Sequence, residues 1–223
     1  MTAPDLRFDG PVTLAGGAPF SAADLALCLA LAGPLLAADS GADRLLGLGH
    51  VPRAVIGDLD SLSGAGRAAL PPETLIEVGE QDSTDFEKCL SRIAAPLVVA
   101  LGFAGGRVDH ALSVFNTLVR YPDHRCVVVG DTDVVCLAPP EIALDLIAGD
   151  RLSLFPLRPV RGSSAGLVWP IAGHDFAPGG MIGTSNRAAG PVTLGFAGPG
   201  MLLILPRCRL DRLIAGLAEA PRW

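Results

Sequence analysis

The sequence predicts an α/β fold in two parts, because its two halves follow different patterns. Up to Pro139, short apolar runs alternate with helical segments, which is typical of a mostly parallel sheet covered by helices. After Pro140, short β-rich segments follow one another between Gly and Pro turns, at a spacing typical of a small β-sandwich. We therefore predict a Rossmann-like α/β domain in residues 1–140 with flanking helices, followed by a small β-sandwich domain in residues 141–223.

The first domain is expected to begin with a strand that runs into a glycine turn and a capped helix. Residues 12–15 are apolar and lead into Gly16-Gly17, and Ser21 can cap a helix that starts at Ala22. Later apolar runs also end in turns that carry acids or glycines. Further strands are expected at residues 35–38, 53–56, 75–78, 97–101, 126–129 and 134–137, and further helices at 44–48, after 84 and up to 121.

The second domain is expected to consist of short strands and one closing helix. Its apolar segments are separated by Gly and Pro residues, which favour turns. In the tail, apolar residues recur at helical spacing, which indicates a short packed helix. The strands are expected at residues 151–155, 167–171, 181–184, 191–196 and 201–205, and the helix contains Leu210, Leu213, Ile214 and Leu217.

The composition indicates a globular protein with a sizeable core. Half of the 223 residues are hydrophobic, and a net charge of -6 without any Lys or Arg run argues against a nucleic-acid partner. The longest apolar stretch, residues 25–38, is interrupted by Gly33-Pro34 and is too short to span a bilayer, so no membrane partner is expected. A signal peptide needs a basic segment in front, but Arg7 is balanced by neighbouring acids. We therefore expect a cytoplasmic protein.

The cysteines fit the same compartment. They are odd in number, scattered and without a C-x-x-C motif, and most stand within apolar runs. This pattern predicts reduced core residues in a cytosolic protein. The five residues are Cys28, Cys89, Cys126, Cys136 and Cys208.

The segment Gly57-Asp58-Leu59-Asp60-Ser61 places two carboxylates at the end of an expected strand. If Gly57 turns the chain, both acids lie at the edge where open α/β sheets bind their ligands. Two charges about 4 Å apart repel by roughly 4 kcal/mol at an effective dielectric near 20, so a close pair favours a cation between them. Carboxylate oxygens suit Mg²⁺ held together with substrate phosphates. A turn Asp followed by a helix-capping residue explains the motif by itself equally well.

Further acids follow neighbouring strands and are expected at the same edge. Asp39 follows the strand at residues 35–38, and Asp82 and Asp85 follow the strand at residues 75–78. Asp85 also stands in the first turn of an expected helix, where an acid is favourable in any protein. The recurrence of acids at one sheet edge is what favours a metal site over a set of unrelated turns.

A glycine-rich loop follows the strand at residues 97–101. Its glycines leave backbone amides free to approach an anion, and the helix start and Arg107 add positive potential. The loop lacks the G-x-G-x-x-G spacing and the following acid of a dinucleotide site, which argues against a nicotinamide or flavin cofactor. His110 is expected to be a packed helix residue rather than a catalyst.

With these segments assembled, the chain closely resembles the thiamine pyrophosphokinase family from Val12 to about Leu205. Several motifs in family order are far more specific together than any one of them. Ser40 departs from the pattern, since the family usually has Gly there, and the backbone φ at that position is in question. The matching segments are Asp39-Ser40-Gly41-Ala42, Gly57-Asp58-Leu59-Asp60-Ser61, Gln81-Asp82-Ser83-Thr84-Asp85-Phe86-Glu87-Lys88, Gly105-Gly106-Arg107-Val108-Asp109-His110, Gly166-Leu167-Val168-Trp169-Pro170 and Thr184-Ser185-Asn186.

The resemblance implies an enzyme that transfers the pyrophosphoryl group of ATP to thiamine, giving thiamine diphosphate and AMP, with Mg²⁺ as cofactor. It further implies a homodimer whose sites join the α/β domain of one chain to the β domain of the other. Which acid, if any, acts as the base stays open. The implied catalytic and metal-binding residues are Asp58, Asp60, Asp82 and Asp85, the ATP-binding residues are Asp39, Gln81, Arg107 and Lys88, and the thiamine-binding residues are Asp109, Trp169, Ser185 and Asn186.

Two other functions fit parts of the pattern. Clustered acids near an Asp-His pair also suit a metal-dependent phosphohydrolase, although histidine ligands are scarce. A thiamine- or nucleotide-binding regulator without turnover is the third possibility, but a pure binder has little use for carboxylates that repel one another. Without the resemblance, Trp169 is explained by a sandwich core and Ser185-Asn186 by an ordinary turn.

Overall fold

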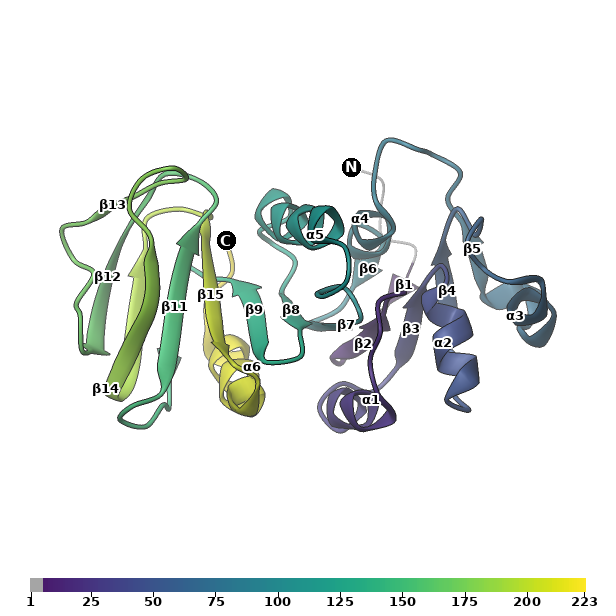
Figure 1. The fold of residues 1–223 in the computed structure, drawn as a ribbon, viewed down its shortest axis with the longest axis horizontal. Helices are drawn as coiled ribbons and strands as arrows, with labels where there is room; N and C mark the ends of the chain where they lie inside the picture. The colour runs from purple at the N-terminus through teal and green to yellow at the C-terminus, as the bar shows by residue number, and fades with distance from the viewer. Residues whose placement is uncertain (1–5) are drawn as a thin grey trace. The chain divides into compact units, whose positions relative to one another are not determined.

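The computed structural model describes residues 6–223, which form two compact units (Figure 1). The first unit contains the chain up to Thr117 together with Val128–Asp131. The second contains Leu118–Val127 and Thr132–Trp223. Each unit is built around its own arrangement of strands, and the predicted change from alternating strands and helices to a β-rich region is present. The protein therefore has the mixed α/β fold that the sequence predicts.

The first unit is built on a parallel sheet with the strand order β7-β2-β3-β4-β5. Every residue of the first four of these strands is buried, as expected for strands covered on both faces. Their sequences are accordingly continuous apolar runs. The strands are β2 (Val12–Ala15), β3 (Leu35–Ala38), β4 (Ala54–Gly57), β5 (Leu75–Glu77) and β7 (Val98–Leu101).

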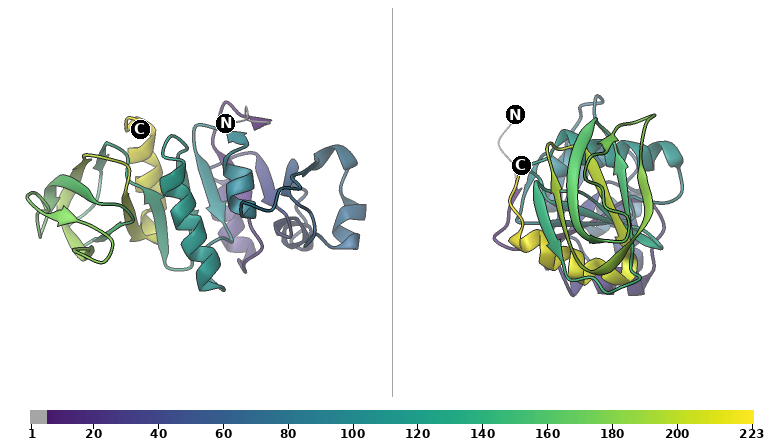
Figure 2. Two further views of the ribbon diagram at one scale, coloured as in Figure 1. Left: turned by 90° about the horizontal axis from the view of Figure 1, so that it is seen from above. Right: turned by 90° about the vertical axis from the view of Figure 1, so that its left-hand side faces the viewer.

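The helices of the first unit begin where the sequence supplies a cap. Ser21 and Asp24 form a reciprocal capping box at the first helix, and the Thr84 hydroxyl accepts from the N–H of Glu87 at the fourth. Figure 2 shows the helices packed along the sheet. They are α1 (Ala22–Leu29), α2 (Gly41–Gly47), α3 (Gly64–Ala69), α4 (Asp85–Leu90) and α5 (Val108–Arg120), with a 3-10 turn at Pro72–Thr74 and a short parallel pair formed by β1 (Leu6–Arg7) and β6 (Ile93–Ala94).

The second unit is mostly antiparallel. Its long strand β14 pairs with β11 through its first half and with β10 and β12 through its second half. One closing helix, α6 (Leu210–Glu219), follows the 3-10 turn Arg207–Arg209. The strands are β9 (Asp133–Leu137), β10 (Glu141–Leu144), β11 (Arg151–Pro156), β12 (Val160–Leu167), β13 (Asp175–Phe176), β14 (Gly183–Phe196) and β15 (Met201–Pro206), while β8 (Cys126–Val129) contains the residues at which the chain changes units.

Three details of the sequence prediction are wrong in the second unit. The strand expected at residues 167–171 ends at Leu167 and begins at Val160, because the polar run before Gly166 alternates in burial and pairs with β14. The strand expected at residues 181–184 begins only at Gly183, and it continues through residues 191–196 as the single strand β14. Cys208 is exposed, whereas the other four cysteines are buried free thiols.

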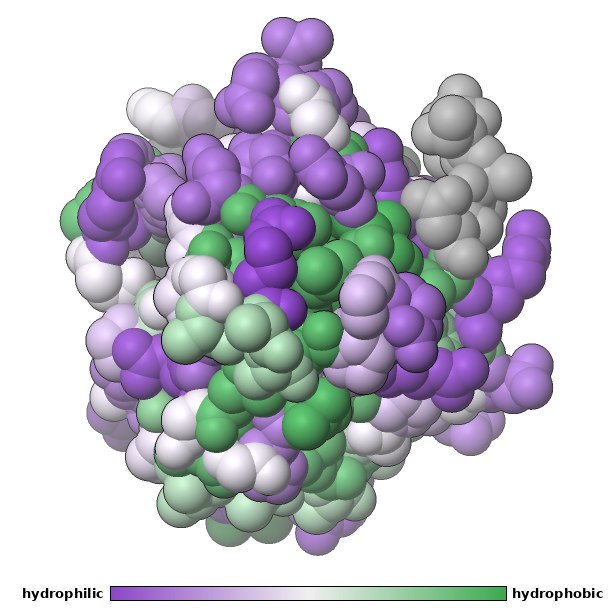
Figure 3. Space-filling model, turned by 90° about the vertical axis from the view of Figure 1, so that its right-hand side faces the viewer, coloured by the Kyte–Doolittle hydropathy of each residue, from purple (hydrophilic) through white to green (hydrophobic). Residues whose placement is uncertain are grey.

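Figure 3 faces the end of the first unit that carries α3 and the edge strand β5. Apolar surface gathers in the middle of this face, with hydrophilic surface around it. Leu75 and Ile76 of β5 are only half-buried, since in the described residues this strand pairs with β4 alone.

Within residues 6–223 no helix has the length and apolar character that crossing a bilayer requires.

Candidate active site

Three carboxylates meet at the carboxyl ends of β3 and β4. Asp39 directly follows β3, and Asp58 and Asp60 follow β4. One oxygen from each of the three lies within 4.8 Å of the others. Asp39 and Leu59 have left-handed φ values of 43° and 60°, which turn the chain sharply at both strand ends. The predicted meeting of acids at one sheet edge is therefore present, with Asp39 as its third member.

Glycines allow the two strand ends to approach each other. A Cβ on Gly57 would lie 3.1 Å from the Cβ of Asp39, and one on Gly41 would lie 2.3 Å from the carbonyl oxygen of Ala15. The second distance is impossible without a backbone shift, so α2 can begin next to β2 only with glycine at position 41. The question about Ser40 is settled, because its φ of -59° is right-handed and the left-handed residue of this turn is Asp39.

Asp39 is the least solvated acid of the cluster. Its side chain is 2% exposed, and neither carboxylate oxygen has a hydrogen-bond partner within the described residues. Burial, and after it the neighbouring Asp58 carboxylate, raises the pKa of Asp39 to about 6. A buried carboxylate without donors is costly unless it is protonated or paired with a cation. The cluster therefore fits a hard divalent ion such as Mg²⁺, which prefers oxygen ligands.

Asp58 is held by two side-chain donors on the same oxygen. The Lys88 ammonium lies 2.8 Å from Oδ2 of Asp58, and Nε2 of Gln81 donates to that oxygen at 3.3 Å. The hydrogen bond from Lys88 is the main reason why the pKa of Asp58 lies well below its usual range. Burial opposes the charge on Lys88, but its contact with Asp58 outweighs this and raises the pKa of the lysine. The two residues form a charged pair.

The remaining predicted acids lie beside this cluster. Asp85 begins α4, and its Oδ1 lies 3.7 Å from the Lys88 ammonium. Burial is the largest cause that raises the pKa of Asp85, although Lys88 opposes it. Asp82 stands in the exposed loop before α4, and its backbone N–H donates to Glu80. The structure therefore brings Asp85 close to the cluster through Lys88, while Asp82 is outside the set of three meeting acids.

Glu80 is a residue that the sequence analysis missed. Its carboxylate accepts from the backbone N–H groups of Asp82 and Ser83 and from the Ser83 hydroxyl. In the sequence, Glu80 stands two and three residues before the backbone amides that it binds. This spacing is common in turns, so by itself it does not identify a site residue. Ser61 was also missed as a site residue, and its hydroxyl donates to Asp60 at 2.9 Å.

A pocket of about 460 Å³ opens next to the acid cluster, entirely within the first unit. The glycine-rich loop after β7 forms one wall, and the turn before α4 forms another. Phe86 and Phe103 lie in its lining with their ring centroids 4.8 Å apart. The predicted site residues in the lining are Asp58, Gln81, Asp85, Lys88 and Arg107, and His110, which was expected to be a packed helix residue, is exposed and lines it as well.

Arg107 and Asp109 form an exposed bidentate ion pair. Nη2 of Arg107 lies 2.7 Å from Oδ2 of Asp109, and Nε lies 3.2 Å from Oδ1. The Arg107 guanidinium is the main cause that lowers the pKa of Asp109 to about 2. The pair directs the fork of Arg107, which is the geometry that binds planar carboxylates and phosphates. Asp109 itself is not part of the pocket lining.

The other predicted thiamine residues lie together in the second unit. The buried Asn186 side chain donates to the carbonyl of Trp169 at 2.7 Å and accepts from its N–H at 3.2 Å. The indole is 57% exposed, so Trp169 is not a core residue. Ser185 is exposed with a left-handed φ of 63°, and its N–H donates to Ser153. Asn186 thus fixes the backbone that presents Trp169.

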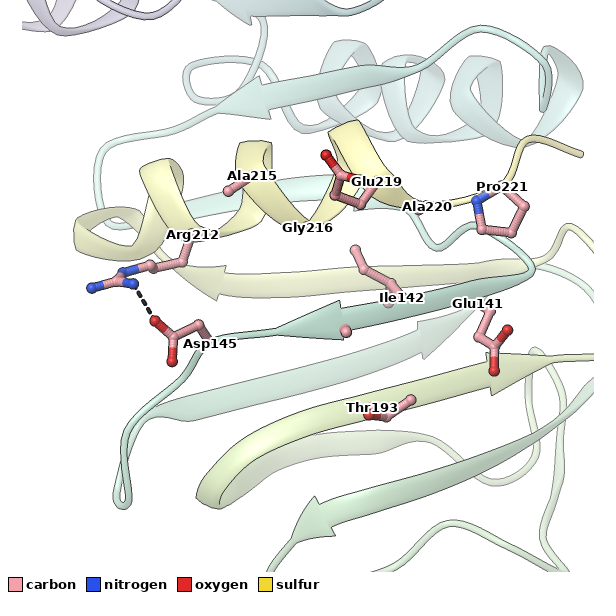
Figure 4. A pocket seen from close by; sticks show the side chains of 11 residues that line it. Glu141, Ile142, Asp145, Thr193, Arg212, Ala215, Gly216, Glu219, Ala220 and Pro221 are labelled. Atoms are coloured by element: carbon pink, nitrogen blue, oxygen red, sulfur yellow. Dashed lines mark hydrogen bonds and ion pairs between the residues drawn. The ribbon is translucent and has the colours of Figure 1, made fainter.

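Another hollow, of about 470 Å³, lies in the second unit between α6 and the strands β10 and β14 (Figure 4). Arg212 of α6 and Asp145, just after β10, form an ion pair at its rim. Helix and strand come close here, since a Cβ on Gly216 would lie 2.6 Å from the carbonyl oxygen of Ala143. None of the residues predicted for the site lines this hollow.

Comparisons with known proteins point to one family. The family model described as "Thiamin pyrophosphokinase, catalytic domain" matches residues 27–135. Thiamine pyrophosphokinase 1 of Arabidopsis thaliana is 30% identical over 156 residues, which are 61% of this chain and 58% of the relative. The chain thus spans less than two thirds of the curated relatives that it matches.

Solved structures show the same fold. The crystal structure of thiamin pyrophosphokinase from Geobacillus thermodenitrificans superposes with a TM-score of 0.72 at 23% identity, covering 87% of this chain and 96% of that one. Thiamin pyrophosphokinase from Candida albicans superposes with a TM-score of 0.75 at 16% identity, covering 92% and 93% of the two chains. The resemblance seen in the sequence is therefore confirmed, since residues 27–135 match the model of the thiamin pyrophosphokinase catalytic domain.

Proposed function

We propose that the protein transfers the pyrophosphoryl group of ATP to the hydroxyl oxygen of thiamine, giving thiamine diphosphate and AMP. The observation that carries the proposal is the buried, donor-free carboxylate of Asp39 next to Asp58 and Asp60, at the mouth of a pocket with a glycine-rich wall. The family match supports the choice of substrates. In the reaction the thiamine hydroxyl oxygen bonds to the β-phosphorus and loses its proton to the solvent or a base. The bond from the β-phosphorus to the oxygen that bridges it to the α-phosphorus breaks, and AMP leaves with that oxygen.

The metal site of this proposal is the acid cluster. Asp39, Asp58 and Asp60 are the acids whose oxygens converge. The metal set proposed from the sequence is Asp58, Asp60, Asp82 and Asp85, and Asp39, there an ATP-binding residue, is now added to it. A bound Mg²⁺ supplies positive charge that stabilises the phosphate oxygens as charge develops on them. The protein's own part is to direct these carboxylates at one place and to keep Asp58 ionised. The donors on Asp58 and the backbone turns at Asp39 and Leu59 support that part.

The ATP-binding set proposed from the sequence lies in the first unit, and the thiamine-binding set, apart from Asp109, lies in the second. Gln81, Lys88 and Arg107 line the pocket, and Asp39 stands in the adjoining cluster. Arg107 is proposed to exchange its partner Asp109 for phosphate oxygens, and Asp109 then becomes free for the aminopyrimidine of thiamine. In the second unit, the exposed indole of Trp169 offers a stacking face, while Ser185 and Asn186 offer hydrogen bonds.

One experiment separates this function from its alternatives. The protein is incubated with ATP, Mg²⁺ and thiamine, and the nucleotide product is identified. AMP that forms only when thiamine is present supports the proposed transfer. Hydrolysis that does not need thiamine indicates a metal-dependent phosphohydrolase, and binding without turnover indicates a regulator. Either result overturns the proposal.

Arg107→Lys is expected to reduce activity by about tenfold or more. A lysine offers a point charge, so it loses both the bidentate contact with Asp109 and the planar fork on phosphate. Steady-state kinetics should show the loss in kcat and in KM for ATP, with little change in KM for thiamine. If only the thiamine KM rises, Arg107 has been assigned to the wrong substrate. Arg120→Lys, at the other end of α5, is the control and should behave as wild type.

We also propose a homodimer in which each site takes its acids from one chain and its thiamine residues from the other. The predicted acids lie in one compact unit and Trp169, Ser185 and Asn186 lie in the other, which supports the proposal, since a site that needs both units can be assembled across chains. Two inactive variants, Asp58→Asn and Trp169→Ala, then complement each other. If Trp169→Ala retains activity, Asn186→Ala replaces it, because Asn186 fixes the Trp169 backbone.

Activity should reappear when the two variants are mixed under conditions that allow subunit exchange. A mixed dimer with shared sites has one site with both lesions and one site with neither, so up to half of its sites are intact. Mixing each variant with itself provides the matched control. Should the mixture stay inactive although exchange is shown by mass, each site lies within one chain and the shared-site proposal fails.

Two finer proposals concern architecture and location. The parallel order β7-β2-β3-β4-β5 supports a Rossmann-like first domain, and the pairing of β14 with strands on both sides of its midpoint supports a β-sandwich second domain. The functional boundary near residue 140 stays a prediction. So does a cytoplasmic location, which four buried free thiols support.

A further inference from the structure

Lys88 is an exception in this sequence. It is the single lysine among 17 lysine and arginine residues, so every other permanent cation on a side chain is an arginine. It is also buried, with a side chain only 2% exposed on α4. A lysine is almost never fully buried unless its charge is paired. Here the pairing partner is the acid cluster of the proposed active site.

The contacts of Lys88 concentrate on one oxygen of that cluster. Its ammonium lies 2.8 Å from Oδ2 of Asp58 and 3.7 Å from Oδ1 of Asp85. Gln81 donates to the same Oδ2 from the pocket side. Oδ1 of Asp58 receives the backbone N–H of Asp60 at the long distance of 3.5 Å, and no side-chain cation contacts it in the described part of the chain. The two oxygens of Asp58 are therefore unequal: Oδ2 has two side-chain donors, and Oδ1 is the freer ligand.

We propose that Lys88 is a positioning residue, which occupies Oδ2 of Asp58 so that Asp58 presents Oδ1 alone to the cation. On this basis Lys88 acts on the cation through Asp58 and does not touch the phosphates. The inference rests on the proposed function for the identity of the cation as Mg²⁺. An arginine cannot replace Lys88, because its guanidinium is larger and planar and does not fit the buried place where a compact ammonium contacts one oxygen of Asp58. This accounts for a lysine in a chain that otherwise uses arginine.

The single lysine makes a direct test possible. Because Lys88 is the single lysine, protein labelled with ¹³C at the lysine Cε gives one labelled side-chain NMR signal. We expect this signal to shift when Mg²⁺ is added without nucleotide, because the ion changes the charge on the partner of Lys88. A non-hydrolysable ATP analogue added to the Mg²⁺-saturated protein should add less than half of that shift. If the Lys88 signal does not shift with Mg²⁺ but shifts with the nucleotide, Lys88 contacts a phosphate and the proposal is overturned.

Lys88→Met gives a second test that does not depend on turnover. Removal of the ammonium frees Oδ2 of Asp58 and removes a repulsive charge next to the cation. Mn²⁺ binding without nucleotide, measured by electron paramagnetic resonance, should therefore become about tenfold tighter. At the same time kcat should fall about tenfold with KM for ATP changed less than threefold, because Asp58 no longer holds one orientation. Unchanged or weaker Mn²⁺ binding overturns the proposal, and so does a tenfold higher KM at unchanged kcat.

Arg92→Met is the matched control. It removes a cation four residues further along, whose guanidinium donates to the carbonyl of Lys88 and to Ser91 rather than to the cluster. If Lys88 only stabilises α4, both variants lose stability and neither tightens Mn²⁺ binding, which also overturns the proposal. Failure of the proposed function gives another result, because wild-type protein then forms no AMP with thiamine. The Mg²⁺ response of the Lys88 signal and the Mn²⁺ affinities do not depend on that reaction, so they still test the role of Lys88.

Discussion

Asp58→Asn and Asp60→Asn are both expected to abolish turnover, and Asp58→Asn alone is expected to weaken the fold. Each change removes one ligand charge from the cation site and no core volume. The expected cost is about 4 kcal/mol of transition-state stabilisation, or about a thousandfold in kcat/KM. Asp60 is exposed and its side chain accepts from Ser61, so its loss leaves no buried charge behind.

Asp58 differs because it is the partner of the buried Lys88. An asparagine leaves that ammonium without its nearer counter-charge, with Asp85 still 3.7 Å away, and breaking one side of a buried pair costs about 3 kcal/mol. The Asp58 variant is therefore expected to be less stable than wild type, whereas the Asp60 variant keeps the fold intact. Urea unfolding of both variants in EDTA measures the loss of stability, and activity assays at low Mg²⁺ measure the loss of turnover. Near wild-type activity in both variants would rule out the metal assignment.

Asp39→Asn is expected to make the metal-free protein more stable at pH 8 while it removes metal binding. The folded-state pKa of Asp39 is about 6, against an ordinary value of 3.8. A raised carboxyl pKa means that the folded state favours the neutral form. The resulting stability is fully present below about pH 4 and is lost as the pH rises through 6. The loss is about 3 kcal/mol when complete, from about 1.4 kcal/mol per pKa unit.

The asparagine variant avoids this loss, since its side chain does not ionise. It also suits the site, because asparagine tolerates the left-handed φ of 43° at this position. Urea unfolding in EDTA should therefore show equal stability of both proteins at pH 4 and a more stable variant at pH 8. Adding Mg²⁺ at pH 8 should stabilise the wild type and leave the variant unchanged. A difference that is the same at both pH values would contradict the assignment to Asp39 ionisation.

The sequence alone determined the order and type of most elements in the first unit. The strands there are buried on both faces, so they appear as continuous apolar runs such as residues 35–38, and their ends are marked by glycines and helix caps. Because parallel strands bring their carboxyl ends to one edge, the meeting of Asp39, Asp58 and Asp60 also followed from the sequence. Local signals were sufficient at these places.

Only the tertiary structure decided what depends on pairing between distant residues. The run at residues 160–166 is polar and glycine-rich, yet it is a strand because β14 offers it a partner. The burial of Asp39 without a hydrogen-bond donor in the described residues is also visible only in the structure. So is the contact of Lys88 with Asp58, which stands 30 residues earlier in the chain. Burial, charge pairing and sheet partners are set by the whole fold, so no pattern within one segment contains them.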